Sequence, residues 1–137
     1  MPRKRRRITA EDLYNFEIIN GCEISPDGKH VVFSVQRVDK KTEKKYSDIW
    51  VVSSRGGRPK RFTYGDWVDS NPKWSPDGTQ IAFLSNRKDE KQSQLYLIPF
   101  DGGEARPLTD MQGNFGSFEW SPDGITFVCE FSKKDQE

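Results

Sequence analysis

The stretch Ser25-Pro26-Asp27-Gly28 returns twice in this chain, as Ser75-Pro76-Asp77-Gly78 and Ser121-Pro122-Asp123-Gly124. The three copies start 50 and 46 residues apart. Proline fixes φ at about −65°, which suits the second position of a type I turn. Aspartate can bond to its own nearby backbone, and glycine adopts the left-handed conformation that closes a turn. Each copy therefore predicts a tight hairpin turn between two strands.

The repeat extends beyond the turn. Trp74 and Trp120 each precede the serine, and Ile24 takes that place in the first copy. The residues after each turn read as a second strand, in Lys29–Val35, Thr79–Ser85 and Ile125–Phe131. A third strand follows, in Asp48–Val52 and Gln94–Ile98. A Gly-Gly turn comes next, at Gly56-Gly57 and Gly102-Gly103. A short edge strand ends the repeat, in Arg61–Thr63 and Pro107–Thr109.

The two repeat lengths differ by four residues, and the difference maps to one place. Thr63 and Ser75 are 12 residues apart, as are Thr109 and Ser121, so this part of the repeat is constant. The extra residues fall in the charged stretch 39–45, Asp-Lys-Lys-Thr-Glu-Lys-Lys. Because exposed loops tolerate insertions, this stretch predicts a lengthened hairpin loop.

Four strands in a repeat of about 45 residues are typical of a β-propeller blade. The second and third strands are nearly continuous apolar runs, as expected when both faces of a sheet are covered by neighbouring blades. The predicted fold is therefore all-β, with blades of four antiparallel strands and a short N-terminal helix. A β-sandwich built from hairpins with similar turns is the alternative.

The 137 residues hold about two and a half blades: blade 1 over about 20–63, blade 2 over about 69–109 and a partial blade 3 over about 115–131. A propeller ring needs roughly 4–8 blades, so the ring is incomplete. We expect either a portion of a longer protein or several copies that associate through open blade edges. We expect residues 1–8 to form a basic flexible tail and residues 9–137 to form the partial propeller.

The basic run Arg3–Arg7 favours a solvated tail over a nucleic-acid contact. Ile8–Phe16 then predicts a short helix, with Thr9 as its N-cap and Asp12 in the capping-box position. Leu13 and Phe16 supply an apolar face, and because one or two turns are unstable alone, this helix is expected to dock on a partner.

Composition favours a soluble protein without a global charge bias. The net charge is +1, and 31% of the residues are charged, so neither nucleic acid nor a membrane surface is an expected partner. No apolar stretch approaches the length of about 20 residues that spans a bilayer, and no apolar segment follows the basic start as in a signal peptide. Cys22 and Cys129 are expected to be buried, reduced thiols, and a cytoplasmic location is expected.

Catalytic and metal-binding patterns are missing from the sequence. No Gly-x-Ser-x-Gly elbow occurs. His30 is the single histidine and is expected on the blade surface, with no activated nucleophile near it. One histidine and two distant cysteines do not make a zinc site. The Asp-Gly pairs lack the spacing of a calcium loop and are turn formers: Asp27, Asp77, Asp101 and Asp123. No catalytic, cofactor-binding or metal-binding residue is predicted, and no cofactor.

Tryptophans offer the remaining signal for binding. Trp74 and Trp120 recur at one repeat position, which predicts core packing. Trp67 lies in the loop 64–69 between two blades and is a candidate for a surface contact. Loops between blades gather at the ends of the central channel, where propellers bind partners.

The chain resembles the N-terminal propeller of acylaminoacyl-peptidase-like members of the prolyl oligopeptidase family. The resemblance runs from Ile8 onward and is carried by the opening 8–13, the turn 24–28, the strand 47–52, the segment 72–85 and the residues 94–96 and 102–109. The periplasmic propeller of the Tol system carries similar blade motifs. The opening helix joined directly to blade 1 favours the peptidases.

The resemblance implies a second, C-terminal α/β-hydrolase domain that holds a Ser, Asp and His triad, and no position of this chain matches that triad. It also implies that the propeller gates the access of peptides to the hydrolase domain, and that the opening helix packs near that domain. By itself this chain is then not an enzyme, although its parent is a serine peptidase. A propeller that only binds other proteins, as in the Tol system, is the alternative.

Overall fold

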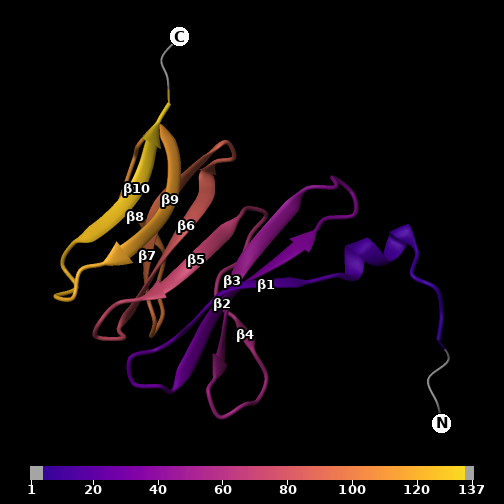
Figure 1. Cartoon of the computed structure of the whole chain (residues 1–137), viewed down its shortest axis with the longest axis horizontal. Helices are drawn as coiled ribbons and strands as arrows, with labels where there is room; N and C mark the ends of the chain where they lie inside the picture. Colours follow the sequence, from indigo (N-terminus) through magenta and orange to yellow (C-terminus); the bar gives the residue numbers. More distant parts are fainter. Residues whose placement is uncertain (1–4, 135–137) are drawn as a thin grey trace.

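Three antiparallel sheets stand side by side like the opened part of a fan in the computed structural model, which describes residues 5–134 (Figure 1). Blade 1 contains β1 (Ile18–Ile24), β2 (His30–Val38), β3 (Lys45–Ser53) and β4 (Lys60–Arg61) in that order. Blade 2 repeats it with β5 (Asp69–Trp74), β6 (Gln80–Asp89), β7 (Gln92–Pro99) and β8 (Arg106–Pro107). Blade 3 pairs β9 (Gly113–Trp120) with β10 (Phe127–Lys133). The predicted open set of propeller blades is confirmed.

The three Ser-Pro-Asp-Gly turns have one hydrogen-bond pattern. In the first, the Gly28 N–H donates to the Ser25 carbonyl at 2.9 Å, and the Ser25 hydroxyl donates to Asp27 at 2.6 Å. Asp27 also accepts from the Lys29 N–H at 2.9 Å, while the Ser25 hydroxyl oxygen accepts from the His30 N–H at 3.0 Å. The same bonds recur around Ser75 and Ser121. The side chains of the motif therefore satisfy the backbone of the turn.

Neighbouring turns also contact one another, which explains the proline and the glycine together. Gly78 has a φ of +73°, and a Cβ added there would lie 3.5 Å from the Pro26 ring of the preceding blade. Gly124 has a φ of +74°, and its Cβ would lie 3.6 Å from Pro76. Each proline thus packs on the glycine of the next turn. A side chain at either glycine would be strained by its positive φ, while its Cβ would meet that proline at ordinary van der Waals distance.

The apolar core lies between blades rather than within them. We call the face of a blade that packs on the preceding blade its leading face, and the opposite one its trailing face. The first core joins Val32 and Ile49, on the trailing face of blade 1, to the leading face of blade 2, which presents Trp74, Ile81, Phe83, Tyr96 and Ile98. The second core joins Ala82, Leu84, Leu95 and Leu97 of blade 2 to Phe118 of blade 3.

At each contact between two blades, a tryptophan forms a hydrogen bond to the preceding blade. The Trp74 indole N–H donates to the Glu23 carbonyl at 3.1 Å, and the Trp120 indole N–H donates to the Lys73 carbonyl at 3.4 Å. Glu23 and Lys73 hold the same place in successive repeats, so the bond is repeated from blade to blade. Trp74 is buried, which confirms its predicted core role, while Trp120 is half-buried against the second core.

Strand ends differ modestly from the predicted ones. The loop between β2 and β3 has six residues, Asp39–Lys44, and the loop between β6 and β7 has two, Glu90–Lys91, which confirms where the four extra residues lie. The edge strands β4 and β8 are shorter than predicted and end before Phe62 and Leu108. Phe62 still donates to the Ile49 carbonyl at 2.7 Å, and Leu108 donates to the Leu95 carbonyl at 2.7 Å.

The opening helix is a single 3-10 element, η1 (Ala10–Asn15). The Thr9 N–H donates to the Asp12 carboxylate at 2.8 Å, in the predicted capping arrangement. Arg6 binds the same carboxylate with two nitrogens, at 2.5 and 2.9 Å, and this pairing holds the pKa of Asp12 well below its usual range. Arg6 is thus tied to η1, whereas residues 1–4 of the predicted tail lie outside the described residues.

One prediction about the cysteines is wrong. Both thiols are free, but Cys22 is exposed and Cys129 is half-buried. Cys22 lies in a bulge of β1, opposite Phe33, where the register of β1 on β2 shifts between Asn20 and Glu23. Cys22 lines an open hollow together with Pro72 of β5 and Phe118 of β9, so an apolar strand context did not mean burial here. Burial raises the pKa of the Cys129 thiol.

Replacing Trp74 tests the inter-blade core. We expect Trp74→Ala to lower the free energy of unfolding by about 3–5 kcal/mol, because it removes a buried indole and leaves a cavity between blades 1 and 2. Trp120→Ala, the matched variant at the next joint, should cost less because Trp120 is half-buried. Urea denaturation followed by circular dichroism measures both. Equal losses for the two variants would contradict this account.

The three turn aspartates predict a loss of stability in acid. The serine hydroxyl, and next the backbone N–H two residues on, lower the pKa of Asp27, Asp77 and Asp123. A carboxyl whose pKa is lower in the folded than in the unfolded chain stabilises the fold above its unfolded pKa, about 3.9 for aspartate, and this stabilisation is lost as the pH falls through the folded-state pKa. The melting temperature should therefore hold steady from about pH 7 to 5 and fall below about pH 4.

The matched variant replaces all three turn aspartates with asparagine, which keeps an acceptor oxygen but does not titrate. Its melting temperature should depend less on pH below about pH 4 than that of the wild type. Asp101→Asn, in an Asp-Gly turn without the serine, is the control and should leave the fall in melting temperature below about pH 4 unchanged. If the melting temperature of the triple variant fell below pH 4 as steeply as that of the wild type, the three aspartates would not be the source of the acid sensitivity.

Candidate functional site

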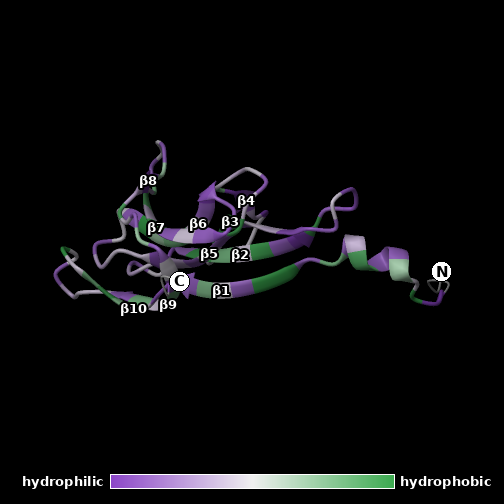
Figure 2. Ribbon diagram, turned by 90° about the horizontal axis from the view of Figure 1, so that it is seen from above, coloured by the Kyte–Doolittle hydropathy of each residue, from purple (hydrophilic) through white to green (hydrophobic). Residues whose placement is uncertain are grey.

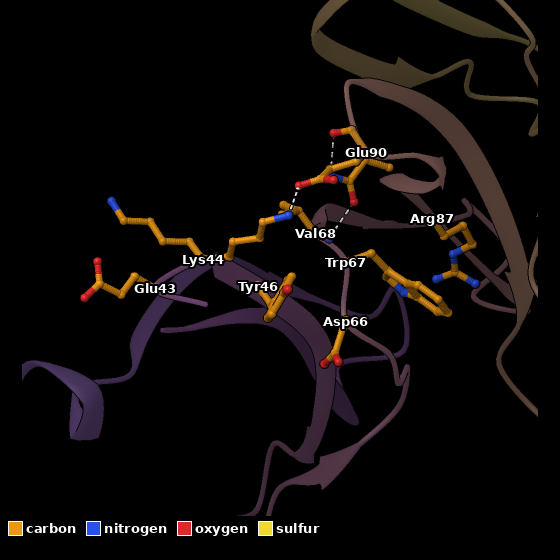
Figure 3. Close-up of a pocket in the computed structure, with 10 residues that line it drawn as sticks. Glu43, Lys44, Tyr46, Asp66, Trp67, Val68, Arg87 and Glu90 are labelled. Carbon is orange, nitrogen blue, oxygen red and sulfur yellow. Dashed lines mark hydrogen bonds and ion pairs between the residues drawn. The ribbon is translucent and has the colours of Figure 1, made fainter. Parts of the chain in front are cut away.

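A groove of about 530 Å³ opens at one rim of the sheets, between blades 1 and 2 (Figure 3). Its walls are the loop and start of β3 in blade 1, the connection from blade 1 to blade 2 and the end of β6 in blade 2. Tyr46, Trp67 and Arg87 each come from one of these three segments. The groove is therefore assembled from parts of the chain that only blade stacking brings together.

Arg87 is the most constrained side chain of the groove. Its Nη2 donates to both carboxylate oxygens of Asp69 at 3.0 Å, and its Nε donates to the Ser85 hydroxyl at 2.9 Å. Three aromatic rings surround the guanidinium at 4.9–5.2 Å, those of Trp67, Phe83 and Tyr96. Asp69 is fully buried and the side chain of Arg87 is 20% exposed, so one edge of this buried ion pair reaches the groove.

The Asp69 backbone couples this pair to blade 1. Its carbonyl accepts from the Ser34 hydroxyl at 3.0 Å and from the Ser47 hydroxyl at 2.6 Å. Both serines are buried on blade 1. The floor of the groove is thereby a polar network that crosses the joint between the blades, and it is fully desolvated at Asp69.

Arg37 holds the place of Arg87 in blade 1, and both lie twelve residues after the serine of the turn. Arg37 donates to the Gly65 carbonyl at 3.2 Å and to Asp66 at 3.1 Å, and it also pairs with the buried Asp48 at 3.4 Å. It thus holds the connection between the blades. This repeated arginine was missed in the sequence, although its constant offset from the repeated serine could have revealed it.

The outer wall of the groove carries both signs of charge. Lys44 and Glu90 form an ion pair of 2.6 Å across the mouth, seen as a dashed line in Figure 3, and this bond raises the pKa of Lys44. Glu43, Asp66 and Lys45 also line the groove. With two aromatic rings and mixed charges, the groove can contact a peptide through ring faces and hydrogen bonds, but it offers no activated nucleophile.

A second polar row runs along the innermost strands. Glu23, Lys73 and Glu119 each stand two residues before the serine of their repeat. Lys73 Nζ lies 2.8 Å from Glu119 and 3.9 Å from Glu23. Burial raises the pKa of Glu23, against the opposing effect of a hydrogen bond from the Trp74 N–H. Alternating charges thus link three blades along one line.

His30 does not lie on an open blade surface as predicted. Its ring is half-buried between blades, 4.9 Å from the Phe100 ring and 6.4 Å from the Trp74 ring. No side-chain hydrogen bond of His30 occurs within residues 5–134, and the ring serves to pack the two blades together. Trp67, the predicted surface contact, is half-buried; its ring covers Gly65, and its indole nitrogen is buried without a partner in the same range.

The described residues contain no group of three or more histidine, cysteine, aspartate and glutamate side chains that could hold a metal ion. No helix within them is long and apolar enough to cross a membrane.

Comparison with known proteins agrees with this architecture. The family described as the TolB beta propeller domain matches residues 5–137. The chain belongs to this family. As a TolB-type propeller, it is 32% identical to the peptidase YuxL of Bacillus subtilis over 84 residues. That match covers 61% of this chain and 13% of YuxL, so the chain spans a small part of the curated relative that it matches.

Solved structures share the arrangement of blades. A protein assigned as TolB from Agrobacterium tumefaciens superposes with a TM-score of 0.66 and 28% identity, over 88% of this chain and 40% of that one. The acylaminoacyl peptidase of Pyrococcus horikoshii superposes with a TM-score of 0.72 and 18% identity, over 91% of this chain and 19% of that one. The TolB-type propeller fold therefore occurs both in peptidases and in TolB proteins.

Breaking the buried ion pair tests the floor of the groove. Arg87→Ala leaves the Asp69 carboxylate buried and unpaired, so we expect a loss of about 3–5 kcal/mol in the free energy of unfolding. Lys44→Ala, in the exposed pair on the outer wall of the same groove, is the control and should change stability little. Chemical denaturation of both variants measures the difference. A loss for Lys44→Ala as large as that for Arg87→Ala would refute the account.

Proposed function

We propose that this chain is the N-terminal, non-catalytic propeller portion of an acylaminoacyl-peptidase-like serine peptidase of the prolyl oligopeptidase family. The similarity to the peptidase YuxL, at 32% identity over 84 residues, carries the proposal. The single histidine of the sequence packs against the rings of Trp74 and Phe100, which supports a structural role for it rather than that of the base in a Ser-His-Asp triad. The hydrolysis then belongs to a separate α/β-hydrolase domain of the parent, in the cytoplasm.

The contribution of the propeller is to gate the access of peptides to that domain. The groove between blades 1 and 2 supports a role in peptide contact, because it combines the half-buried rings of Tyr46 and Trp67 with donors and acceptors at one rim of the sheets. A bound peptide would meet fixed aromatic surfaces there, since Arg87 and Trp67 are held by the buried network beneath them.

A propeller that only binds other proteins, as in the Tol system, is the second candidate. The 28% identity to the Agrobacterium TolB protein over 88% of this chain favours it. The two candidates differ in the presence of a catalytic domain and in location, because the Tol propeller is periplasmic.

The test compares this chain with the product of its extended coding region. We expect the extended product to hydrolyse acylated or aminoacyl chromogenic peptide substrates and to react with a fluorophosphonate serine probe, whereas this chain does neither. Replacing the serine of a Gly-x-Ser-x-Gly elbow in the extension with alanine is the control and should abolish both signals. An extended product with a complete propeller, no elbow and a periplasmic location would support the Tol-type alternative instead.

A further inference from the structure

The turn between β3 and β4 of blade 1, together with the residue just before β2, carries four cations that we call the basic corner: Lys29, Arg55, Arg58 and Lys60. All residues from 53 to 60 are exposed, and so is Lys29. The segment 53–65 contains no aspartate or glutamate. One outer corner of the sheet is therefore strongly positive, although the net charge of the whole chain is only +1.

Backbone pairing brings Lys29 to the turn. The Ser54 N–H donates to the Lys29 carbonyl at 2.9 Å, and Lys29 and Arg55 line one hollow of about 540 Å³. The acid that lines this hollow is Asp27, whose carboxylate already accepts from the Ser25 hydroxyl and from the Lys29 N–H. The hollow thus offers two cations to a carboxylate that enters from solvent.

The cations of the basic corner have no internal partner. Within residues 5–134 none of the four forms an ion pair. Arg61, the next cation along the chain, differs: it pairs with the buried Asp48 at 2.9 Å and lies over the Tyr64 ring at 4.8 Å. Because like charges at one corner repel one another, the fold gains nothing from placing the four there.

Blade 2 builds the same turn with the opposite charge. The positions equivalent to the basic corner hold one cation and two acids, in Thr79, Asp101, Glu104 and Arg106. The backbone is shared, since both Gly-Gly pairs have positive φ, and the Phe100 N–H donates to the Thr79 carbonyl at 2.9 Å as Ser54 does to Lys29. The architecture of a blade therefore does not require cations at this corner.

The basic corner lies at the other end of blade 1 from the groove. Strand β3 begins at Lys45, which lines the groove, and ends at Ser53, so its nine residues separate the two surfaces by about 26 Å. Strand β4 is the outer strand of the sheet and pairs with β3 (Figure 1). Figure 2 shows hydrophobic ribbon along the inner strands β1 and β2, whereas β4 is hydrophilic. A partner can reach the corner from outside without entering the groove.

We propose that the basic corner docks an acidic polypeptide segment, an extended stretch with three or more aspartate or glutamate side chains. Guanidinium groups bind carboxylates through two parallel hydrogen bonds, and lysine adds a compact charge. Two arginines and two lysines that lack internal partners match such a stretch in sign and in number. The proposal does not depend on the proposed peptidase function, because neither the groove nor a hydrolase domain takes part.

Two other polyanions fit the corner less well. Proteins hold single-stranded nucleic acid by stacking its bases on aromatic rings, but the segment 53–61 has no aromatic residue, and Tyr64 beside it already has Arg61 over its ring. Anionic membranes bind surfaces that combine cations with inserting apolar side chains, and the same segment has no large apolar side chain.

Binding of a fluorescein-labelled hexaglutamate peptide, followed by fluorescence anisotropy in about 50 mM salt, tests the site. The variant Arg55→Asp with Arg58→Glu gives blade 1 the residues that blade 2 carries in the same turn, so its melting temperature should stay within about 2 °C of wild type. Its affinity for the peptide should fall about tenfold or more, because attraction becomes repulsion at two positions. Arg55→Gln with Arg58→Gln, which removes the charges without reversing them, should show a smaller loss and decides the matter if the reversal variant unfolds.

Lys41→Glu with Lys91→Glu is the matched control. It changes the net charge by the same amount, at exposed positions of the loops β2–β3 and β6–β7, at the groove end of the blades. Since exposed charges farther apart than about 8–10 Å are largely screened, its affinity should stay within about twofold of wild type. Raising the salt to about 300 mM should weaken the binding of the wild type several-fold.

Absence of hexaglutamate binding in about 50 mM salt overturns the proposal. So does wild-type affinity in both arginine variants, or a loss in the lysine control as large as that in the reversal variant. Tighter binding of an oligothymidine strand, or of phosphatidylcholine vesicles that contain phosphatidylserine, overturns the choice of a polypeptide partner if the reversal variant abolishes it.

Discussion

The structure depends on the contact of each blade with the one before it. A single four-stranded sheet of this kind is apolar on both faces and cannot bury either face by itself. Stacking solves this, and the contact is specified three times over: by the interdigitated aliphatic and aromatic core, by the indole bond to the preceding innermost strand, and by the proline that packs on the next glycine.

The polar groups of the joint follow from the same constraint. Asp69 has no access to water; its carboxylate pairs with Arg87, while its backbone carbonyl accepts hydrogen bonds from two serines of blade 1. Of the three aromatic rings around Arg87, that of Trp67 lines the groove at the rim. The groove is in this way a by-product of how two blades satisfy a buried charge.

Much of this could be predicted from the repeats. The turn motif predicted the hairpins correctly, because its serine, proline, aspartate and glycine stabilise the turn through local hydrogen bonds and backbone angles. The four extra residues were assigned correctly to the loop between β2 and β3, since a comparison of two repeats locates an insertion without any knowledge of the fold. The groove could not be predicted in this way. Its side chains come from distant segments, and Asp69 has no acidic equivalent in the other repeats, where Ile19 and Phe115 take its place.

The sequence by itself determined the elements and their order: local turn chemistry and the apolar runs of the second and third strands need no distant partner to be recognised. Tertiary structure alone decided what is covered. Cys22 sits in an apolar strand and is nevertheless exposed, and His30 begins a strand yet is half-buried between blades. The physical reason is that burial in a propeller comes from the neighbouring blade, so a side chain of the first blade and its equivalent in the second meet different surroundings although their local sequences are alike.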